Sequence, residues 1–194
     1  MTWHVDNLAS IGGHAPRVEG APKVVETDRG KAVQFDGVRD GLEIPDLPLA
    51  GAREFTIEIV FRPDADGPAE QRFLHLQEHA SESRFLIETR VRPGSVWYLD
   101  TYIQTELGNC TLVDPQKTHP AGAWTAAALS YDGRTMRHYV NGREELAREL
   151  AFRPLGPGRT SIGMRLNRVH WFKGAIRSVR FTPRALAPEE LLGS

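Results

Sequence analysis

The stretch GAWTAAALSYDGRTMRHYVNG, Gly122–Gly142, decides the fold class of this chain. Residues 124–131 and 136–140 are short segments of strand-like composition, and the Asp-Gly pair between them is typical of a turn that leads one strand back into the next. Alternation along the second segment places His138 on its apolar face. We therefore predict an antiparallel strand pair in which His138 faces the core and hydrogen-bonds a buried partner.

The same two-residue periodicity extends through most of the chain, whereas helical periodicity is nearly absent. In FTIEIVFRP, residues 55–63, apolar side chains share one face and mostly polar ones the other, before a proline ends the strand. Glycine, proline, asparagine and aspartate separate the expected strands, as is typical of an antiparallel sandwich or jelly roll. A single short helical turn is expected at 187–192, where Pro188 suits the first helical position. The other expected strands are 32–35, 42–44, 71–78, 84–91, 96–103, 160–166 and 175–181.

Composition is that of an ordinary globular protein, and we expect one domain, residues 1–194. The 24 basic and 25 acidic residues nearly cancel, which argues against the strong positive field that nonspecific nucleic-acid binding requires. No apolar run approaches the roughly 20 residues of a membrane-spanning helix, and the first residues lack the pattern of a signal peptide. We expect a soluble domain with no nucleic-acid or membrane partner. Cys110 is the single cysteine, so no intrachain disulfide can form.

Four motifs, taken in order, resemble those of a known family. They are GKAVQFDGVRDGLEI (30–44), FTIEIVFRP (55–63), the opening stretch (122–142) and TSIGMRLNRVHWFKGAIRSVRFTPRALAPEEL (160–191). The chain resembles the laminin-G-like and pentraxin-like branch of the concanavalin A-like lectin/glucanase superfamily. The resemblance implies an all-β, two-sheet antiparallel jelly-roll sandwich with a concave and a convex outer face. It also implies a polysaccharide or oligosaccharide partner and a secreted or periplasmic location.

The resemblance bears on metal ions as well, because pentraxin-like and many laminin-G-like domains bind calcium, which needs several oxygen ligands. Where pentraxins carry acidic residues, this chain has Arg84, Arg165 and Asn167. We therefore predict no metal site of the family type and no cofactor. A structural calcium ion remains an alternative for three aspartates that we interpret as turn-stabilising groups, namely Asp36, Asp40 and Asp132.

Three consecutive expected strands, 71–78, 84–91 and 96–103, place polar and aromatic side chains opposite their apolar faces. If these strands adjoin, the side chains form one patch on the concave sheet. Aromatic rings pack on the apolar side of a sugar, planar polar groups bind its hydroxyls, and arginines favour uronates or sulfates. The leading hypothesis is a carbohydrate-interacting domain that binds a polysaccharide there. The predicted ligand-binding residues are Phe73, Gln77, Arg84, Glu88, Tyr98 and Asp100, with Arg165 and Asn167 reaching in from a loop.

Other functional classes remain open for the same patch. A small polysaccharide lyase acting on an acidic glycan would use His75 as base, Arg90 to neutralise the carboxylate and Tyr102 as acid. A glycoside hydrolase would need Glu88 and Asp100 to approach within about 5 Å, which requires neighbouring strands in register. A protein-adhesion module is a third option, and a solvated face without a ligand explains the same alternation.

Overall fold

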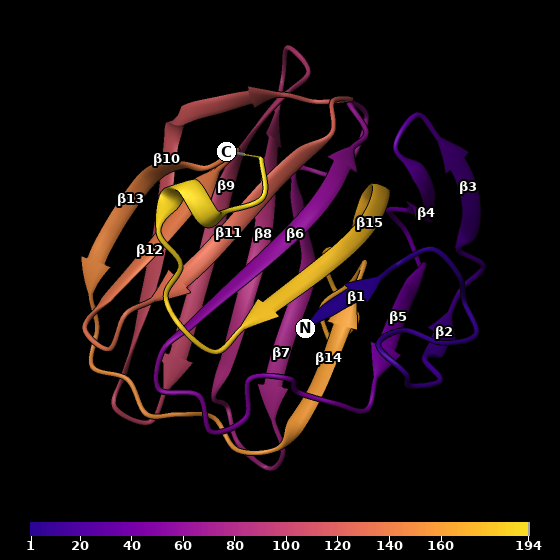
Figure 1. Cartoon of the computed structure of the whole chain (residues 1–194). Helices are drawn as coiled ribbons and strands as arrows, with labels where there is room; N and C mark the ends of the chain where they lie inside the picture. Colours follow the sequence, from indigo (N-terminus) through magenta and orange to yellow (C-terminus); the bar gives the residue numbers. More distant parts are fainter. Residues whose placement is uncertain (194) are drawn as a thin grey trace.

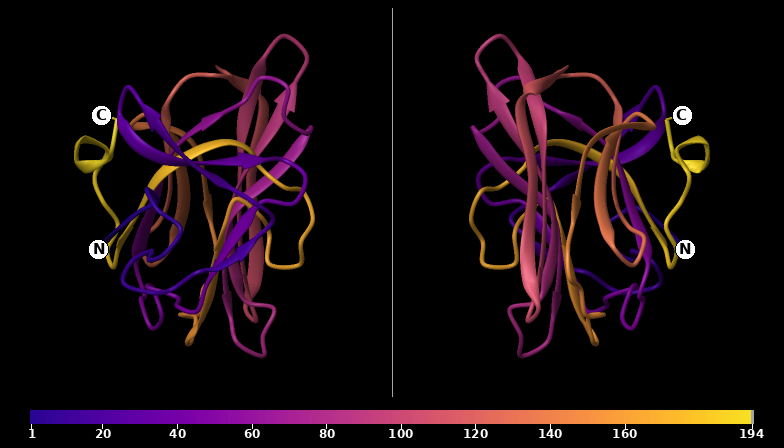
Figure 2. Two further views of the ribbon diagram at one scale, coloured as in Figure 1. Left: turned by 90° about the vertical axis from the view of Figure 1, so that its right-hand side faces the viewer. Right: turned by 90° about the vertical axis from the view of Figure 1, so that its left-hand side faces the viewer.

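The computed structural model describes residues 1–193, which form an all-β jelly-roll sandwich of two antiparallel sheets (Figure 1). Figure 2 shows the two layers edge-on, facing each other across the core. Within residues 1–193, no helix is long and apolar enough to cross a membrane.

The eight-stranded sheet has the order β13 (Arg143–Glu149), β12 (Thr135–Val140), β11 (Thr125–Tyr131), β6 (Phe55–Pro63), β15 (Lys173–Thr182), β4 (Gly30–Asp36) and β3 (Lys23–Thr27), with β1 (Thr2–His4) also paired to β15. The seven-stranded sheet has the order β10 (Gly108–Pro120), β9 (Val96–Thr105), β8 (Arg84–Arg92), β7 (Glu70–Glu78), β14 (Gly158–Ile162), β5 (Gly41–Ile44) and β2 (Arg17–Glu19).

The opening stretch forms the predicted antiparallel pair of β11 and β12, with Leu129 opposite His138. After β12, Asn141 adopts a left-handed conformation with φ of 49°, a region that asparagine tolerates better than most residues. Its side-chain oxygen accepts a hydrogen bond of 3.0 Å from the N–H of Ala126. The turn at the end of β12 is therefore fastened to the beginning of β11.

His138 lies between the sheets and is 1% exposed. Its Nδ1 is 3.0 Å from Oγ1 of Thr101 on β9, in the opposite sheet. Burial, with a smaller contribution from His119, lowers the pKa of His138 to about 4, so the imidazole is neutral at physiological pH. The prediction of a core-facing histidine with a buried partner is confirmed.

The C-terminal segment covers part of the outer face of the eight-stranded sheet (Figure 1). Leu186 and Leu191 pack on Ala128 and Tyr139, which point outward from β11 and β12. Between them, the expected helical turn is present as the 3₁₀ helix η1, Pro188–Glu190. The outer face of the seven-stranded sheet lies on the opposite side of the molecule, and the loop of residues 163–172 projects from that side (Figure 2).

Candidate functional site

The three strands predicted to carry the site, β7, β8 and β9, are neighbours in the seven-stranded sheet. Their registers align the outward side chains in rows that run across the strands. One row contains His75, Leu86 and Tyr102, and the next contains Arg72, Glu88 and Asp100. The predicted patch is therefore continuous.

Phe73 does not belong to this patch, and its predicted outward orientation is wrong. Arg72 pairs with Glu88 but Leu74 pairs with Ile87, so β7 carries one extra residue at this point. Such a β-bulge interrupts the alternation of side chains. Phe73 and Leu74 are both fully buried in the core, and Arg72 takes the outward position.

Three adjoining hollows form a groove across the outer face of the seven-stranded sheet. The first, of about 320 Å³, contains Glu88, Asp100 and Tyr102. The second, also of about 320 Å³, contains His75 and Asn167, and it shares Arg84 and Arg165 with the first. The third, of about 580 Å³, lies at the β7 and β14 end and shares three residues with the second: Gln77, Glu82 and Arg159. Because neighbouring hollows share lining residues, we treat them as one groove.

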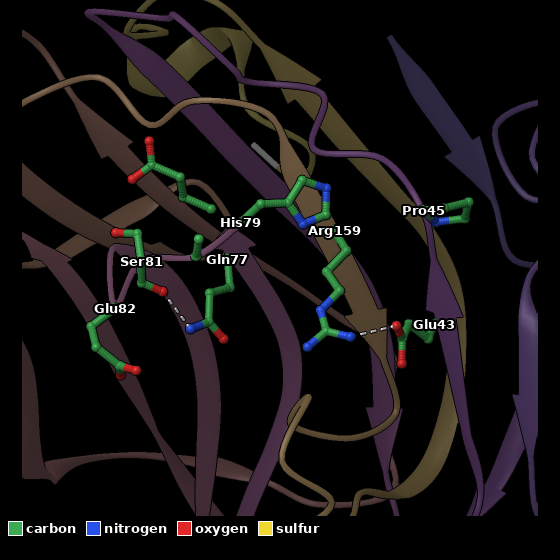
Figure 3. Close-up of a pocket in the computed structure, with 9 residues that line it drawn as sticks. Glu43, Pro45, Gln77, His79, Ser81, Glu82 and Arg159 are labelled. Atoms are coloured by element: carbon green, nitrogen blue, oxygen red, sulfur yellow. Dashed lines mark hydrogen bonds and ion pairs between the residues drawn. The ribbon is translucent and has the colours of Figure 1, made fainter.

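Figure 3 shows the third hollow, where the side chain of Arg159 points toward Glu43 and that of Gln77 toward Ser81. The Nη1 of Arg159 donates to Oε1 of Glu43 over 2.8 Å, and Nε2 of Gln77 donates to the carbonyl oxygen of Ser81 over 2.9 Å. The planar groups at this end of the groove are therefore held in fixed orientations.

A network of ion pairs lies in the first hollow and beside it. Both Nε and Nη2 of Arg90 contact Oδ2 of Asp100, at 2.9 and 2.8 Å, and Nη1 of Arg90 lies 2.6 Å from Glu70. Glu88 is placed between two arginines, with Oε1 3.2 Å from Nε of Arg72 and Oε2 3.5 Å from Nη2 of Arg90. Arginines and carboxylates thus alternate along this part of the sheet, and most of their charges are paired.

Glu88 is 3% exposed, and its pKa is raised to about 7. Burial is the main cause, and the charge of Asp100 directly across from it on β9 adds to the effect. Arg72 and Arg90 oppose the rise without cancelling it. A much larger fraction of Glu88 is therefore protonated at neutral pH than of an ordinary glutamate.

His75 is 2% exposed, and its Nδ1 accepts a hydrogen bond of 3.1 Å from the backbone N–H of Leu166. Burial and the positive charges of Arg165 and Arg84 lower the pKa of His75 well below its usual value. The imidazole is therefore neutral, with its proton on Nε2, because Nδ1 acts as an acceptor. An imidazole in this state holds the loop in place, and it has no free lone pair with which to remove a proton from a substrate.

Arg165 and Asn167 enter the groove from the loop of residues 163–172. Gly163 begins the loop with φ of 80°, and a β-carbon there would lie 2.3 Å from the ring of Phe35. Its N–H donates to the carbonyl oxygen of Phe73, and its own carbonyl accepts from the N–H of Phe172. Both ends of the loop are therefore fixed to the core, so that the position of Arg165 is defined by the fold.

The two predicted tyrosines differ in their relation to the groove. Tyr102 lines the first hollow, and the guanidinium of Arg84 lies over its ring at 5.2 Å. Tyr98 lies one row further on, under Arg92 at 5.6 Å, and is not among the residues that line the three hollows. The aromatic part of the groove is therefore centred on Tyr102.

The family profile described as "Concanavalin A-like lectin/glucanases superfamily" matches residues 36–192. The chain belongs to this superfamily. No curated protein matches the chain in sequence.

Three solved structures of similar fold illustrate the range of this superfamily fold. One is domain 4 of AbnA, a GH43 extracellular arabinanase from Geobacillus stearothermophilus, solved in complex with arabinotriose. Its TM-score is 0.71 and its sequence identity 18%, and the alignment covers 97% of this chain and 94% of that chain. A heptameric SAP-like pentraxin from Limulus polyphemus has a TM-score of 0.64 at 15% identity over 81% and 77%. The binding domain of botulinum neurotoxin DC in complex with SialylT has a TM-score of 0.69 at 13% identity over 97% and 48%. These likenesses support the fold.

The aspartates considered for calcium stabilise turns in this superfamily member. Oδ1 of Asp36 accepts hydrogen bonds from the backbone N–H groups of residues 38–40, and Oδ1 of Asp132 accepts from those of residues 134–135. Oδ1 of Asp40 accepts from the N–H of Ala21 over 2.7 Å. Within residues 1–193, no group of three or more His, Cys, Asp or Glu side chains is arranged to hold a metal ion.

Two arginines of the groove, Arg72 and Arg159, were not among the predicted site residues, although the sequence contained a signal for each. Phe73 and Leu74 are two large apolar residues in a row, and they break the apolar–polar alternation of β7. Such a break is typical of a β-bulge, which here turns Arg72 outward. In β14, Thr160 is buried, so its neighbour Arg159 points to the opposite, outer face of the strand.

Proposed function

We propose that this chain binds a carbohydrate chain in the groove on the outer face of the seven-stranded sheet. The single observation that carries the proposal is the continuity of three hollows on that face. A groove of this kind suits a linear ligand of several sugar units better than a single small molecule. The superfamily neighbours solved with arabinotriose and with SialylT support a saccharide as the class of ligand.

The side chains along the groove have the chemistry that sugars require. The amides of Gln77 and Asn167 and the guanidinium of Arg159 are planar groups that donate or accept in fixed directions, as sugar hydroxyls require. Tyr102 lines one hollow together with Arg84, whose guanidinium lies over its ring. The polar groups can bind sugar hydroxyls, and the aromatic ring can pack on the apolar face of a pyranose in a neighbouring hollow.

A panel of neutral and acidic polysaccharides tests the proposal, with retention in affinity electrophoresis and calorimetry on derived oligosaccharides as the measurements. We expect Arg159→Ala and Asn167→Ala each to weaken binding by about 3- to 10-fold, the size of a lost hydrogen bond. Arg134→Gln serves as control, because Arg134 is highly exposed and belongs to the turn between β11 and β12 of the other sheet. No interaction with any glycan would refute carbohydrate binding.

The register of Glu88 and Asp100 favours a second candidate, glycoside hydrolysis. The two residues are directly opposite each other on β8 and β9, where Cβ atoms are about 4.5–5.5 Å apart. Retaining glycosidases use two carboxyl groups at about 5 Å, one of them protonated. Glu88, with its pKa of about 7, would be the acid, and Asp100, paired with Arg90, the ionised partner. A lyase with His75 as base is less well supported, because Nδ1 of His75 is already engaged.

Reducing ends released from the panel distinguish binding from hydrolysis. Hydrolysis predicts new reducing ends that disappear in Glu88→Gln while affinity for the substrate is retained. Binding without release of products by the wild-type protein would exclude this second candidate and leave the binding proposal intact.

A further inference from the structure

Arg165 differs from the other arginines of the groove because its guanidinium forms no ion pair, although the charges of Glu88 and Glu82 act on it from a greater distance. Arg72 and Arg90 contact Glu88, Arg84 contacts Glu82 and Arg159 contacts Glu43. Among residues 1–193, Arg165 has neither an ion pair nor a hydrogen bond from its side chain. Burial and the like charges of Arg72 and Arg84 lower its pKa. A half-buried guanidinium among other cations is a position that a bound anion would stabilise.

Three buried donors without a protein acceptor belong to residues that line the second hollow. They are Nε of Arg84, Nε of Arg165 and Nε2 of His75. The hydrogen bond from Leu166 to Nδ1 of His75 means that Nε2 carries the proton and can only donate. Buried donors are normally hydrogen-bonded, and an anion that enters the hollow could supply an acceptor for them.

The charges around the second hollow sum to a positive field. Arg84, Arg159 and Arg165 line it. Glu82 is paired with Arg84 and Glu43 with Arg159, so the charge of Arg165 is the one left unbalanced. His75 is neutral and adds no charge. The unbalanced positive charge of Arg165 favours an anion over a cation as the ligand.

We propose that the second hollow binds the anionic substituent of an acidic glycan, a uronate carboxylate or a sulfate group, between Arg84 and Arg165. This inference rests on the proposed function and names the class of saccharide. The guanidinium groups form charge-assisted hydrogen bonds with the anion, and Nε2–H of His75 supplies a further donor. The remainder of the sugar chain extends into the first and third hollows, which adjoin this one.

The loop that carries Arg165 is held before a ligand arrives. Leu166, the next residue, is fastened to His75, and the N–H of Arg168 donates to the carbonyl oxygen of Arg165 over 2.8 Å. Arg168 and His170 have φ of 59° and 55°, conformations that are costly for residues other than glycine and that persist only where the surroundings impose them. A preorganised guanidinium loses little entropy when the anion binds.

Matched pairs of ligands test the inference by calorimetry at constant ionic strength. The carboxylate arm compares oligogalacturonate with its methyl ester, and the sulfate arm compares dextran sulfate with dextran. We expect the wild-type protein to bind the charged member of at least one pair about 10- to 100-fold more tightly, the range for hydrogen bonds to an ionised group. The arm that shows the preference identifies the anion.

Arg165→Gln should remove most of this preference, and Arg134→Gln, which removes an equally positive side chain from the other sheet, should not. Arg165→Gln should also unfold at the same temperature as the wild-type protein or higher, because the arginine has no partner to lose. A purely structural arginine would instead lower the unfolding temperature. Equal affinity for charged and neutral members would overturn the anion site while leaving carbohydrate binding intact.

Inorganic sulfate tests the hollow even if no glycan binds. In ¹H–¹⁵N spectra recorded as sulfate replaces chloride, the Nε–H of Arg165 and the N–H of Leu166 should shift and saturate in the wild-type protein. In Arg165→Gln the shift of Leu166 should be lost. Absence of a saturating shift in the wild-type protein, together with no preference for either charged glycan, refutes the anion site.

Discussion

The clearest quantitative consequence of the site concerns the buried carboxyl group of Glu88. Its pKa is about 7 in the folded protein and about 4.5 when the chain is unfolded. The folded state therefore binds more protons between these two values, and stability falls as the pH rises through that window. The stabilisation of the protonated form is fully present below about pH 4.5 and is lost above about pH 7.

The size of the effect follows from the two pKa values. One pKa unit corresponds to about 1.4 kcal/mol, so a rise from 4.5 to about 7 amounts to about 3 kcal/mol. Glu88→Gln keeps the shape of the protonated acid but cannot ionise. The variant should therefore be more stable than the wild-type protein at pH 8.5, and the difference between the two should be about 3 kcal/mol smaller at pH 4.5.

Urea unfolding of both proteins at pH values from 4.5 to 8.5 measures this difference directly. Glu78→Gln is a suitable control. Burial acts to raise the pKa of Glu78, but hydrogen bonds from Arg153 and from the N–H of Gly156 outweigh it and hold the pKa below the usual value. Folding lowers the pKa of that carboxyl group, so it does not contribute a stability that falls as the pH rises, and Glu78→Gln should not reproduce the pH dependence of Glu88→Gln. Parallel pH profiles for wild type and Glu88→Gln would refute the reasoning about Glu88.

Two further substitutions test the parts of the fold that support the site. Thr101→Val leaves Nδ1 of His138 without its partner and should lower the free energy of unfolding by about 1–3 kcal/mol in urea titrations. Thr101→Ser keeps the hydroxyl and should lower the free energy of unfolding by less. Equal losses of stability in the two variants would contradict the hydrogen bond between Thr101 and His138. Gly163→Ala introduces a β-carbon 2.3 Å from the ring of Phe35 and should lower the unfolding temperature more than Gly13→Ala, which has a similar φ of 89° but no atom within 4 Å. Equal effects at both glycines would mean that backbone conformation alone sets the cost.

The central strands of both sheets could be predicted from the sequence, but the edges could not. Five strands were not predicted, namely β1, β2, β3, β10 and β13, and each of them pairs with a single neighbouring strand at an edge of its sheet. An edge strand is paired on one side only, so charge and proline are favoured there over regular alternation. β13 has the sequence REELARE, and β10 contains Pro115 and ends at Pro120. Charged residues and prolines discourage these edge strands from pairing with another chain. The same residues interrupt the apolar–polar alternation by which strands are recognised in a sequence.

Part of the site could be predicted from the sequence, because regular alternation identifies the outward side chains of a strand that has no bulge. Alternation on β8 and β9 placed Arg84, Glu88 and Asp100 correctly on the outer face, because neither strand carries a bulge there. The bond between Leu166 and His75 joins residues 91 positions apart. No local pattern encodes a contact of that kind, and the state of the imidazole depends on it.

The two buried histidines, His75 and His138, are similar in burial and in their Nδ1 hydrogen bonds, but they lie in different surroundings. Burial lowers the pKa of both, and Nδ1 of each has a hydrogen-bond partner. Nε2 of His138 lies 3.9 Å from Oε2 of Glu145, which is longer than a hydrogen bond. Nε2 of His75 has no partner among residues 1–193, although a buried donor left unpaired costs about 1–3 kcal/mol. An apolar side chain at position 75 would avoid that cost, but it would leave the N–H of Leu166 unpaired. A histidine holds the loop through Nδ1, and its Nε2–H can donate a hydrogen bond to an acceptor that enters the groove beside Arg165.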